Sequence, residues 1–320
     1  MNPTRRLALL AAAACLAHPA LAQNYPEKPI TFIVPFAAGS ATDQLARALG
    51  QAVTAETKQS VVIDNKPGAN AFIGAQAAAK APKDGYSVFI TTNTTHAANE
   101  HLFKSLPYDP VKDFEPVTLL SKGAQILIVN NDLPVKTVGE LVKYAKTNPG
   151  KLSFGSGSSS SRIAGELFKQ MTGAYIVNIP YRSNPPAVTD LIGGQIQLMI
   201  TDMATGLPQV KGGKVRALGV STTKRVPLAP ELPTISEAGV KGYEMSFWFA
   251  AYVPAGTPQP VVARLADILQ KANRSQTVST FYANVGFEPL GGGSDELRKF
   301  QAAESQKWKQ IIQKAGMEKE

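Results

Sequence analysis

An α/β fold with two lobes is predicted for this 320-residue chain from three features. Short apolar runs rich in β-branched residues alternate with segments of helical period, which is typical of βαβ units on a mainly parallel sheet. A long apolar stretch then leads to a second series of such units. Another apolar stretch, Ser246–Pro254, leads back to a helical C-terminal third. Two lobes joined by two or three crossing segments account for this pattern better than two domains in series.

Residues 1–22 have the features of a secretory signal. Arg5 and Arg6 give a positive start, an apolar run follows, and Ala20-Leu21-Ala22 fits the small-x-small rule of signal peptidase. The apolar run is too short for a membrane span. The arginine pair leaves twin-arginine export open. The only cysteine, Cys15, lies in this segment, so we expect a periplasmic mature chain without a thiol; a lipid-anchored Cys15 is the alternative.

The first series of elements begins with a strand expected at Ile30–Val34. A helix follows, because Leu45, Leu49 and Val53 recur on one face. Further strands are expected at 61–63, 87–91 and 119–130. We expect Lys122-Gly123 to break the last of these, at a point where the chain could pass between the lobes.

The second series continues the alternation and is followed by helices. Strands are expected at 151–155, 176–180, 196–200 and 215–220, and helices near 141–145 and 163–171. The C-terminal third predicts helices at 258–272 and 294–315. This organisation assigns residues 23–122 and 247–320 to lobe one and residues 123–246 to lobe two.

The composition excludes several classes of protein. Hydrophobic residues make up 44% of the chain, too many for a disordered protein. The formal net charge is +9, but the basic residues are scattered singly. Nucleic-acid binding would favour a basic stripe with interleaved aromatic residues. We therefore expect no nucleic-acid partner and only a weak attraction for anions.

Three loops that lead into helices are candidate binding segments, because ligands of open α/β sheets bind where strands end and helices begin. Residues 35–43 space Ser40 and Asp43 as a capping box. Residues 155–161 put serines at a helix start, where free N–H groups and the helix dipole favour an anion. Residues 181–186 contain prolines suited to a first helical turn. Each pattern is also typical of a plain loop or cap.

Enzyme interpretations find little support in the sequence. Residues 155–157 fit neither a serine-hydrolase elbow nor a phosphate-binding loop. His96 and His101 are five residues apart, which turns them to different faces of a helix and away from a zinc pair. Asp202 follows a strand and could accept a hydrogen bond from a ligand amine or hydroxyl, or brace its loop. We expect no metal, cofactor or catalysis.

Two functions stay open from these residues. One is a periplasmic hydrolase of a carboxylated ester that uses Ser158 or Ser160 as the nucleophile, although no base is evident. The other is a receptor that signals without transport.

The order and spacing of short motifs resemble the Bug (TctC-like) family, the extracytoplasmic solute receptors of tripartite tricarboxylate transport systems. The similarity runs from Tyr25 to the C-terminal helix. Its motifs are Tyr25-Pro26-Glu27-Lys28-Pro29-Ile30, residues 34–39 with Asp43, residues 65–70, Asp84-Gly85-Tyr86, residues 164–168, Pro180-Tyr181-Arg182 and residues 232–239. The resemblance implies a type II periplasmic-binding-protein fold, in which two lobes close around a ligand cleft.

The resemblance also implies where a carboxylate is held. One carboxylate would meet the loop 36–43, largely through backbone groups and bridging waters, and the other end would meet lobe two at residues 155–161 and near Asp202. The predicted site residues are Phe36, Ala38, Ser40, Thr42, Asp43, Thr92, Asn93, Thr94, Ser156, Ser158, Ser159, Ser160, Arg162 and Asp202.

Two departures from the family pattern bear on the ligand. Gly39-Ser40 replaces a common Gly-Gly pair and adds a hydroxyl, and Arg162 stands where histidine is common. An inward Arg162 would pair with a second carboxylate and favour a dianion, whereas an arginine on the surface would not. We expect a monomeric receptor for a di- or aromatic carboxylate or an acidic amino acid. Its partners would be the membrane subunits of a transporter or a sensor protein.

Overall fold

The computed structural model describes residues 25–320, so the signal predicted for residues 1–22 lies outside the described residues. The strands are β1 (Ile30–Val34), β2 (Val61–Asn65), β3 (Ser87–Thr92), β4 (Phe114–Asn130), β5 (Ser153–Ser156), β6 (Val177–Pro180), β7 (Leu198–Asp202), β8 (Val215–Val220), β9 (Ser246–Pro254) and β10 (Phe287–Pro289). They form one mixed sheet in the order β2-β1-β3-β9-β4-β7-β5-β6, with β8 and β10 also paired to β4.

The helices cover this sheet on both faces. They are α3 (Ala41–Thr57), α4 (Phe72–Ala79), α5 (Asn99–Leu102), α6 (Val138–Thr147), α7 (Ser159–Thr172), α8 (Asn184–Ile192), α9 (Met203–Lys211), α10 (Gln259–Asn273), α11 (Gln276–Val285) and α12 (Ser294–Lys314), with the short turns η1 (Ala69–Ala71) and η2 (Thr94–Ala98). Among the described residues no helix is both long and apolar enough to cross a membrane.

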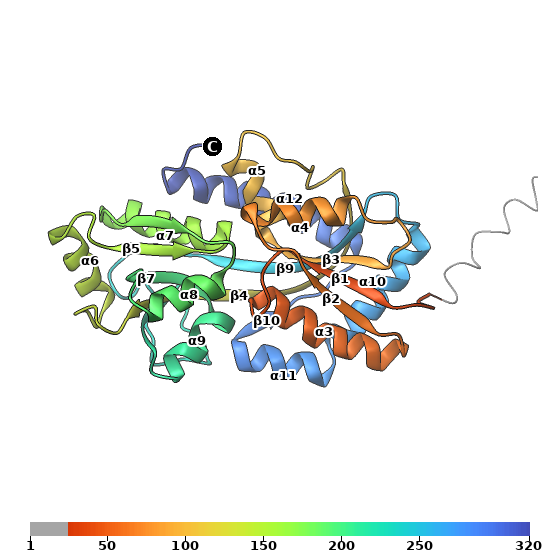
Figure 1. The fold of residues 1–320 in the computed structure, drawn as a ribbon, viewed down its shortest axis with the longest axis horizontal. Coiled ribbons are helices and arrows are strands. Elements are labelled where there is room, and N and C mark those ends of the chain that lie inside the picture. Colours follow the sequence, from red (N-terminus) through yellow and green to blue (C-terminus); the bar gives the residue numbers. More distant parts are fainter. Residues whose placement is uncertain (1–24) are drawn as a thin grey trace, which may run out of the picture.

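The elements gather into two lobes, one at each end of the molecule (Figure 1). Lobe one contains β1–β3 with α3, α4, α10 and α11, and lobe two contains β5–β8 with α6–α9. Within each lobe the neighbouring strands β1–β3 and β5–β7 run parallel, as the βαβ pattern predicts. The two-lobe α/β prediction is therefore confirmed.

Strands β4 and β9 join the lobes. β4 pairs with β9 up to Ala124 and with β7 and β8 from Gln125 onward. The predicted break at Lys122-Gly123 is wrong, because both residues pair with β9 on one side and with β10 on the other. Gly123 serves close packing instead: a Cβ there would lie 2.7 Å from the ring of Phe247 and 2.9 Å from that of Phe287.

Helix α12 adds a third connection between the lobes. Its buried Trp308 and Ile312 belong to the same apolar cluster as Leu167 and Phe168 of α7. The helix also contacts β4 and η2. Figure 1 shows the C-terminus beyond α12 on the side of lobe two. The lobes are thus linked by two strands and by one helix packed across them.

Candidate functional site

A cavity of about 40 Å³ lies between the lobes, where β1, β3, β5 and β7 end and the chain turns into helices. Its lining residues are Phe36, Ser40, Ala41, Thr42, Thr92, Gln125, Ser158, Ser160, Ser183, Asn184, Asp202, Phe247 and Phe249. This volume has room for about three water molecules. A dicarboxylate is larger than this volume.

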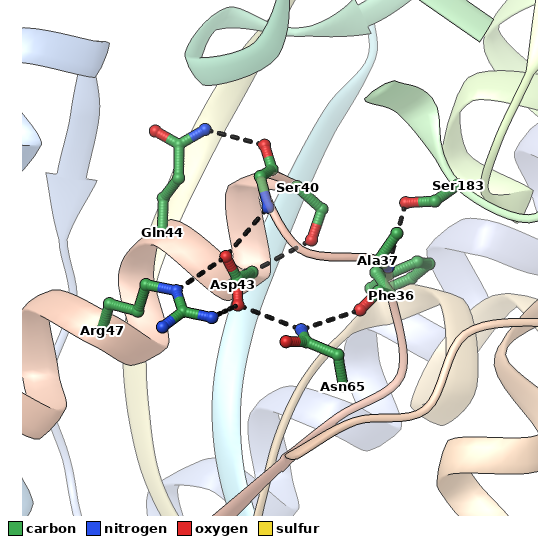
Figure 2. A network of polar contacts seen from close by, with 9 residues as sticks. Phe36, Ala37, Ser40, Asp43, Gln44, Arg47, Asn65 and Ser183 are labelled. Atoms are coloured by element: carbon green, nitrogen blue, oxygen red, sulfur yellow. Dashed lines mark hydrogen bonds and ion pairs between the residues drawn. The ribbon is translucent and has the colours of Figure 1, made fainter. Parts of the chain in front are cut away.

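The loop of lobe one is organised by Asp43. Its carboxylate accepts hydrogen bonds from Arg47 Nε and Nη2 (3.0 Å each), from the Gly39 N–H (2.9 Å) and from Asn65 Nδ2 (3.0 Å), as Figure 2 shows. Burial raises the pKa of Asp43, but these hydrogen bonds outweigh burial and hold the pKa below its usual range. Asp43 is thus an ionised structural anchor, and it is not among the lining residues.

The same loop leaves the start of α3 open to the cavity. Ser40 caps the helix by accepting a hydrogen bond from the Asp43 N–H (3.3 Å), and Gln44 Nε2 donates to the Gly39 carbonyl (3.0 Å). Ala41 and Thr42 are the first helical residues, whose N–H groups have no partner within a helix. Both line the cavity. A helix start of this kind attracts an anion.

The start of α7 faces the cavity from lobe two. Ser158 and Ser161 form a reciprocal capping box, so the fold of this turn depends on both side chains. Ser158 and Ser160 line the cavity. The cavity therefore has a helix start on each side, and hydroxyl groups lie next to both.

Hydrogen bonds cross from one lobe to the other beside the cavity. Asn93 Nδ2 donates to Ser160 Oγ (2.8 Å), and Ser159 Oγ donates to Asn99 Oδ1 (2.7 Å). The Ala37 N–H donates to Ser183 Oγ (3.3 Å; Figure 2). A fourth contact joins Thr94 Oγ1 to Ser160 Oγ (3.5 Å). These contacts connect the two lobes in a closed arrangement.

The lining combines three phenylalanine rings with polar side chains and carries little charge. Within the described residues it contains no lysine, arginine or histidine, and Asp202 is its only charged side chain. The carboxylate of Asp202 caps α9 by accepting from the Thr205 N–H (2.7 Å), and it also accepts from Asn184 Nδ2 (2.9 Å). Asp202 thus braces its loop while still facing the cavity.

Residues 45–317 match the model of the TctC family, described as the tripartite tricarboxylate transporter family receptor. The chain belongs to this family. A protein of Rhodopseudomonas palustris solved with adipate is 36% identical, with a TM-score of 0.89 over 92% of this chain and 100% of that chain. The periplasmic binding protein BugD is 34% identical, with a TM-score of 0.89 and the same coverage.

A more distant solved structure also carries a carboxylate. MatC from R. palustris, with bound malate, is 28% identical to this chain and has a TM-score of 0.85 over 90% of this chain and 100% of that chain. Together these similarities confirm the predicted resemblance to Bug-type receptors and the predicted type II periplasmic-binding-protein fold.

The site residues predicted for this receptor divide into three groups by position. Those that line the cavity are Phe36, Ser40, Thr42, Thr92, Ser158, Ser160 and Asp202. Those buried beside it without lining it are Asp43, Asn93, Thr94, Ser156 and Ser159. Ser156 Oγ donates its hydrogen to Asn178 Oδ1 (2.7 Å), so this hydroxyl donor is already used within lobe two. Ala38 is exposed to solvent outside the lining.

Arg162 belongs to neither of the first two groups. Its guanidinium pairs with the Glu320 carboxylate, and this pairing holds the pKa of Glu320 below its usual range. Of the two orientations that the sequence left open, the structure has the one in which Arg162 is turned to the C-terminus and does not line the cavity. Three further lining residues, Ala41, Ser183 and Asn184, lie in the predicted binding segments 35–43 and 181–186. The lining residues that the sequence interpretation missed altogether are Gln125, Phe247 and Phe249.

The two described histidines both lie away from the cavity. His96 is buried against the ring of Tyr252, with centroids 3.8 Å apart, and burial lowers the pKa of His96 to about 3. His101 Nε2 contacts Oγ of Ser305, a residue of α12 (2.9 Å). No group of three or more metal-ligating side chains occurs within residues 25–320.

Proposed function

We propose that this protein is a periplasmic solute receptor that encloses a small organic carboxylate between its lobes and releases it unchanged to the membrane subunits of a transporter. Lobe one would comprise residues 23–122 and 247–320, and lobe two residues 123–246. The exchange of strand partners on β4 between Ala124 and Gln125 supports this division. Residues 1–22 would direct export.

One observation carries this proposal: helix starts from both lobes line one cavity. The N–H groups of Ala41 and Thr42 on one side and of Ser160 on the other can donate to a carboxylate. Their dipoles add positive potential without a cationic side chain. The neighbours that carry adipate and malate support an organic carboxylate as the solute.

Closure of the lobes would distinguish the receptor with bound solute from the receptor without it. The three shorter hydrogen bonds across the lobes each contribute about 0.5–1.5 kcal/mol net, so together they stabilise the closed form by about 1.5–4.5 kcal/mol. Entry of a solute requires that these bonds open. A solute then favours closure by its additional contacts to both lobes, and the closed form is what a membrane partner would recognise.

Thermal unfolding of the refolded mature chain tests this function against a panel of mono-, di- and tricarboxylates, aromatic acids and amino acids. A solute present at 100 times its Kd adds about 2.7 kcal/mol, which raises the Tm by about 5–11 °C. Substitution Ser160→Phe fills the cavity and should abolish the shift, whereas Ser279→Phe on the exposed side of α11 should keep it. A panel without any stabilising carboxylate would refute the proposal.

A further inference from the structure

The side chains of Gln125 and Asp202 lie next to each other on the wall of the cavity. The two residues are directly opposite in the antiparallel pairing of β4 with β7. Residues opposite each other project to the same face of a sheet, with Cβ atoms about 5 Å apart. Both line the cavity, and they are only 2% and 6% exposed. Gln125 lies within β4, and Asp202 is the N-cap of α9.

Gln125 offers an acceptor that no described residue uses. Its backbone is fixed, because its N–H donates to Ser221 Oγ and its carbonyl accepts from the Ser221 N–H (2.9 Å each). Its side-chain Oε1 is buried and has no donor within hydrogen-bond distance among residues 25–320. A buried amide oxygen without a donor is rare in folded proteins and is costly. A donor on a bound solute would satisfy this atom.

Asp202 adds negative charge at the same place. A carboxylate has about four acceptor positions. The Thr205 N–H, Asn184 Nδ2 and, more weakly, Thr201 Oγ1 occupy three of them. No cationic side chain of the described residues lines the cavity, so a solute carboxylate at this wall would meet a like charge that only hydrogen bonds and the α9 helix start offset.

We propose that Gln125 and Asp202 select a solute that carries a hydrogen-bond donor, an ammonium, amide or hydroxyl group, at the end opposite its carboxylate. This inference rests on the proposed function, because the carboxylate itself is taken to bind at the helix starts. It predicts that amino, amido or hydroxy acids bind more tightly than unsubstituted dicarboxylates of the same length. Gln125 is then a residue that determines specificity.

Isothermal titration calorimetry of the mature wild-type protein tests this order of affinities. The probes are the near-isosteric pairs succinate and succinamate, glutarate and glutaramate, and adipate and adipamate, together with 5-aminopentanoate, 5-hydroxypentanoate and pentanoate. We expect at least one donor-bearing acid to bind tenfold or more tightly than the dicarboxylate of its length. A dicarboxylate that binds as tightly as every donor-bearing acid would overturn the inference.

Two substitutions of similar volume separate the acceptor from the rest of the cavity. Gln125→Met removes both polar atoms, and it should weaken the preferred donor-bearing acid about tenfold while changing the Kd of pentanoate less than twofold. Gln125→Glu retains an acceptor and adds charge, so it should tighten 5-aminopentanoate and weaken glutarate. Equal losses for all probes in Gln125→Met would contradict a specific role.

Failure of this inference differs from failure of the proposed function. Tight binding of an unsubstituted dicarboxylate leaves a carboxylate receptor but removes the donor preference. Absence of binding for every probe, in wild-type protein that unfolds cooperatively, overturns both. The wild-type comparison needs no variant, so a misfolded Gln125→Met or Gln125→Glu protein would not affect it.

Discussion

Replacement of Asp43 by alanine should destabilise the protein and weaken solute binding together. Asp43 is 2% exposed and accepts four hydrogen bonds, two of which come from Arg47, one from Gly39 and one from Asn65. The Arg47 side chain is 52% exposed, so its two bonds together contribute about 0.5–1 kcal/mol. The bonds from Gly39 and Asn65 contribute about 0.5–1.5 kcal/mol each.

The sum is about 1.5–4 kcal/mol of unfolding free energy for Asp43→Ala, which corresponds to a Tm lower by about 3–16 °C. Thermal unfolding followed by circular dichroism measures this loss, and calorimetry measures the Kd for the best carboxylate. The matched control is Arg47→Ala, which removes only the exposed partner and should cost less than about 1 kcal/mol. If Asp43 instead contacted the solute directly, the Asp43→Ala protein would bind the carboxylate more weakly but keep its Tm. That result would refute the structural role of Asp43.

Three further outcomes follow from other parts of the molecule. Arg162→Ala, which breaks a partly buried ion pair with Glu320, should lower the unfolding free energy by about 1 kcal/mol and leave the carboxylate Kd unchanged. A tenfold weaker Kd would show that Arg162 reaches the cavity. Gly123→Ala should lower the unfolding free energy, measured by chemical denaturation, by about 1–3 kcal/mol because the added Cβ meets two aromatic rings. Gly291→Ala, which has open space around it, should lower it little, and equal effects of the two substitutions would contradict the packing role of Gly123. The pKa of His96 is about 3 in the folded protein and near 6.5 in the unfolded chain, so between these pH values the unfolded state binds a proton that the folded state does not. The unfolding free energy should therefore fall as the pH drops from about 6.5 towards 3, and it should fall less steeply in His96→Phe.

The sequence pattern predicts the architecture well where it depends on local periodicity. β1 and β9 occupy the predicted residues, and the C-terminal helix spans nearly the predicted range. Both patterns are local, because strand alternation and a helical face are visible within one segment. In contrast, α9 was not predicted, since Gly206 and Pro208 inside it are usually read as helix breakers. Gly206 is required there because a Cβ would lie 2.7 Å from Ile126.

The composition of the site is less predictable because it depends on distant contacts. The serine-rich start of α7 could be identified from its sequence, as could the loop before α3. The direction of Arg162 could not, since its partner Glu320 lies 158 positions away. Gln125 was missed because it lies within an apolar strand, and only the pairing of β4 with β7 brings it beside Asp202.

The distance between the lobes on addition of a carboxylate tests the central claim most directly. The predicted mature chain contains no cysteine, so spin labels at Gln51→Cys on α3 and Lys146→Cys on α6, both exposed, report the separation of the lobes by pulsed dipolar spectroscopy. A solute identified by thermal shift should narrow the distance distribution and move it to shorter values, because closure buries the solute between α3 and α7. A distribution that is unchanged while the carboxylate binds would contradict capture by closure of the lobes.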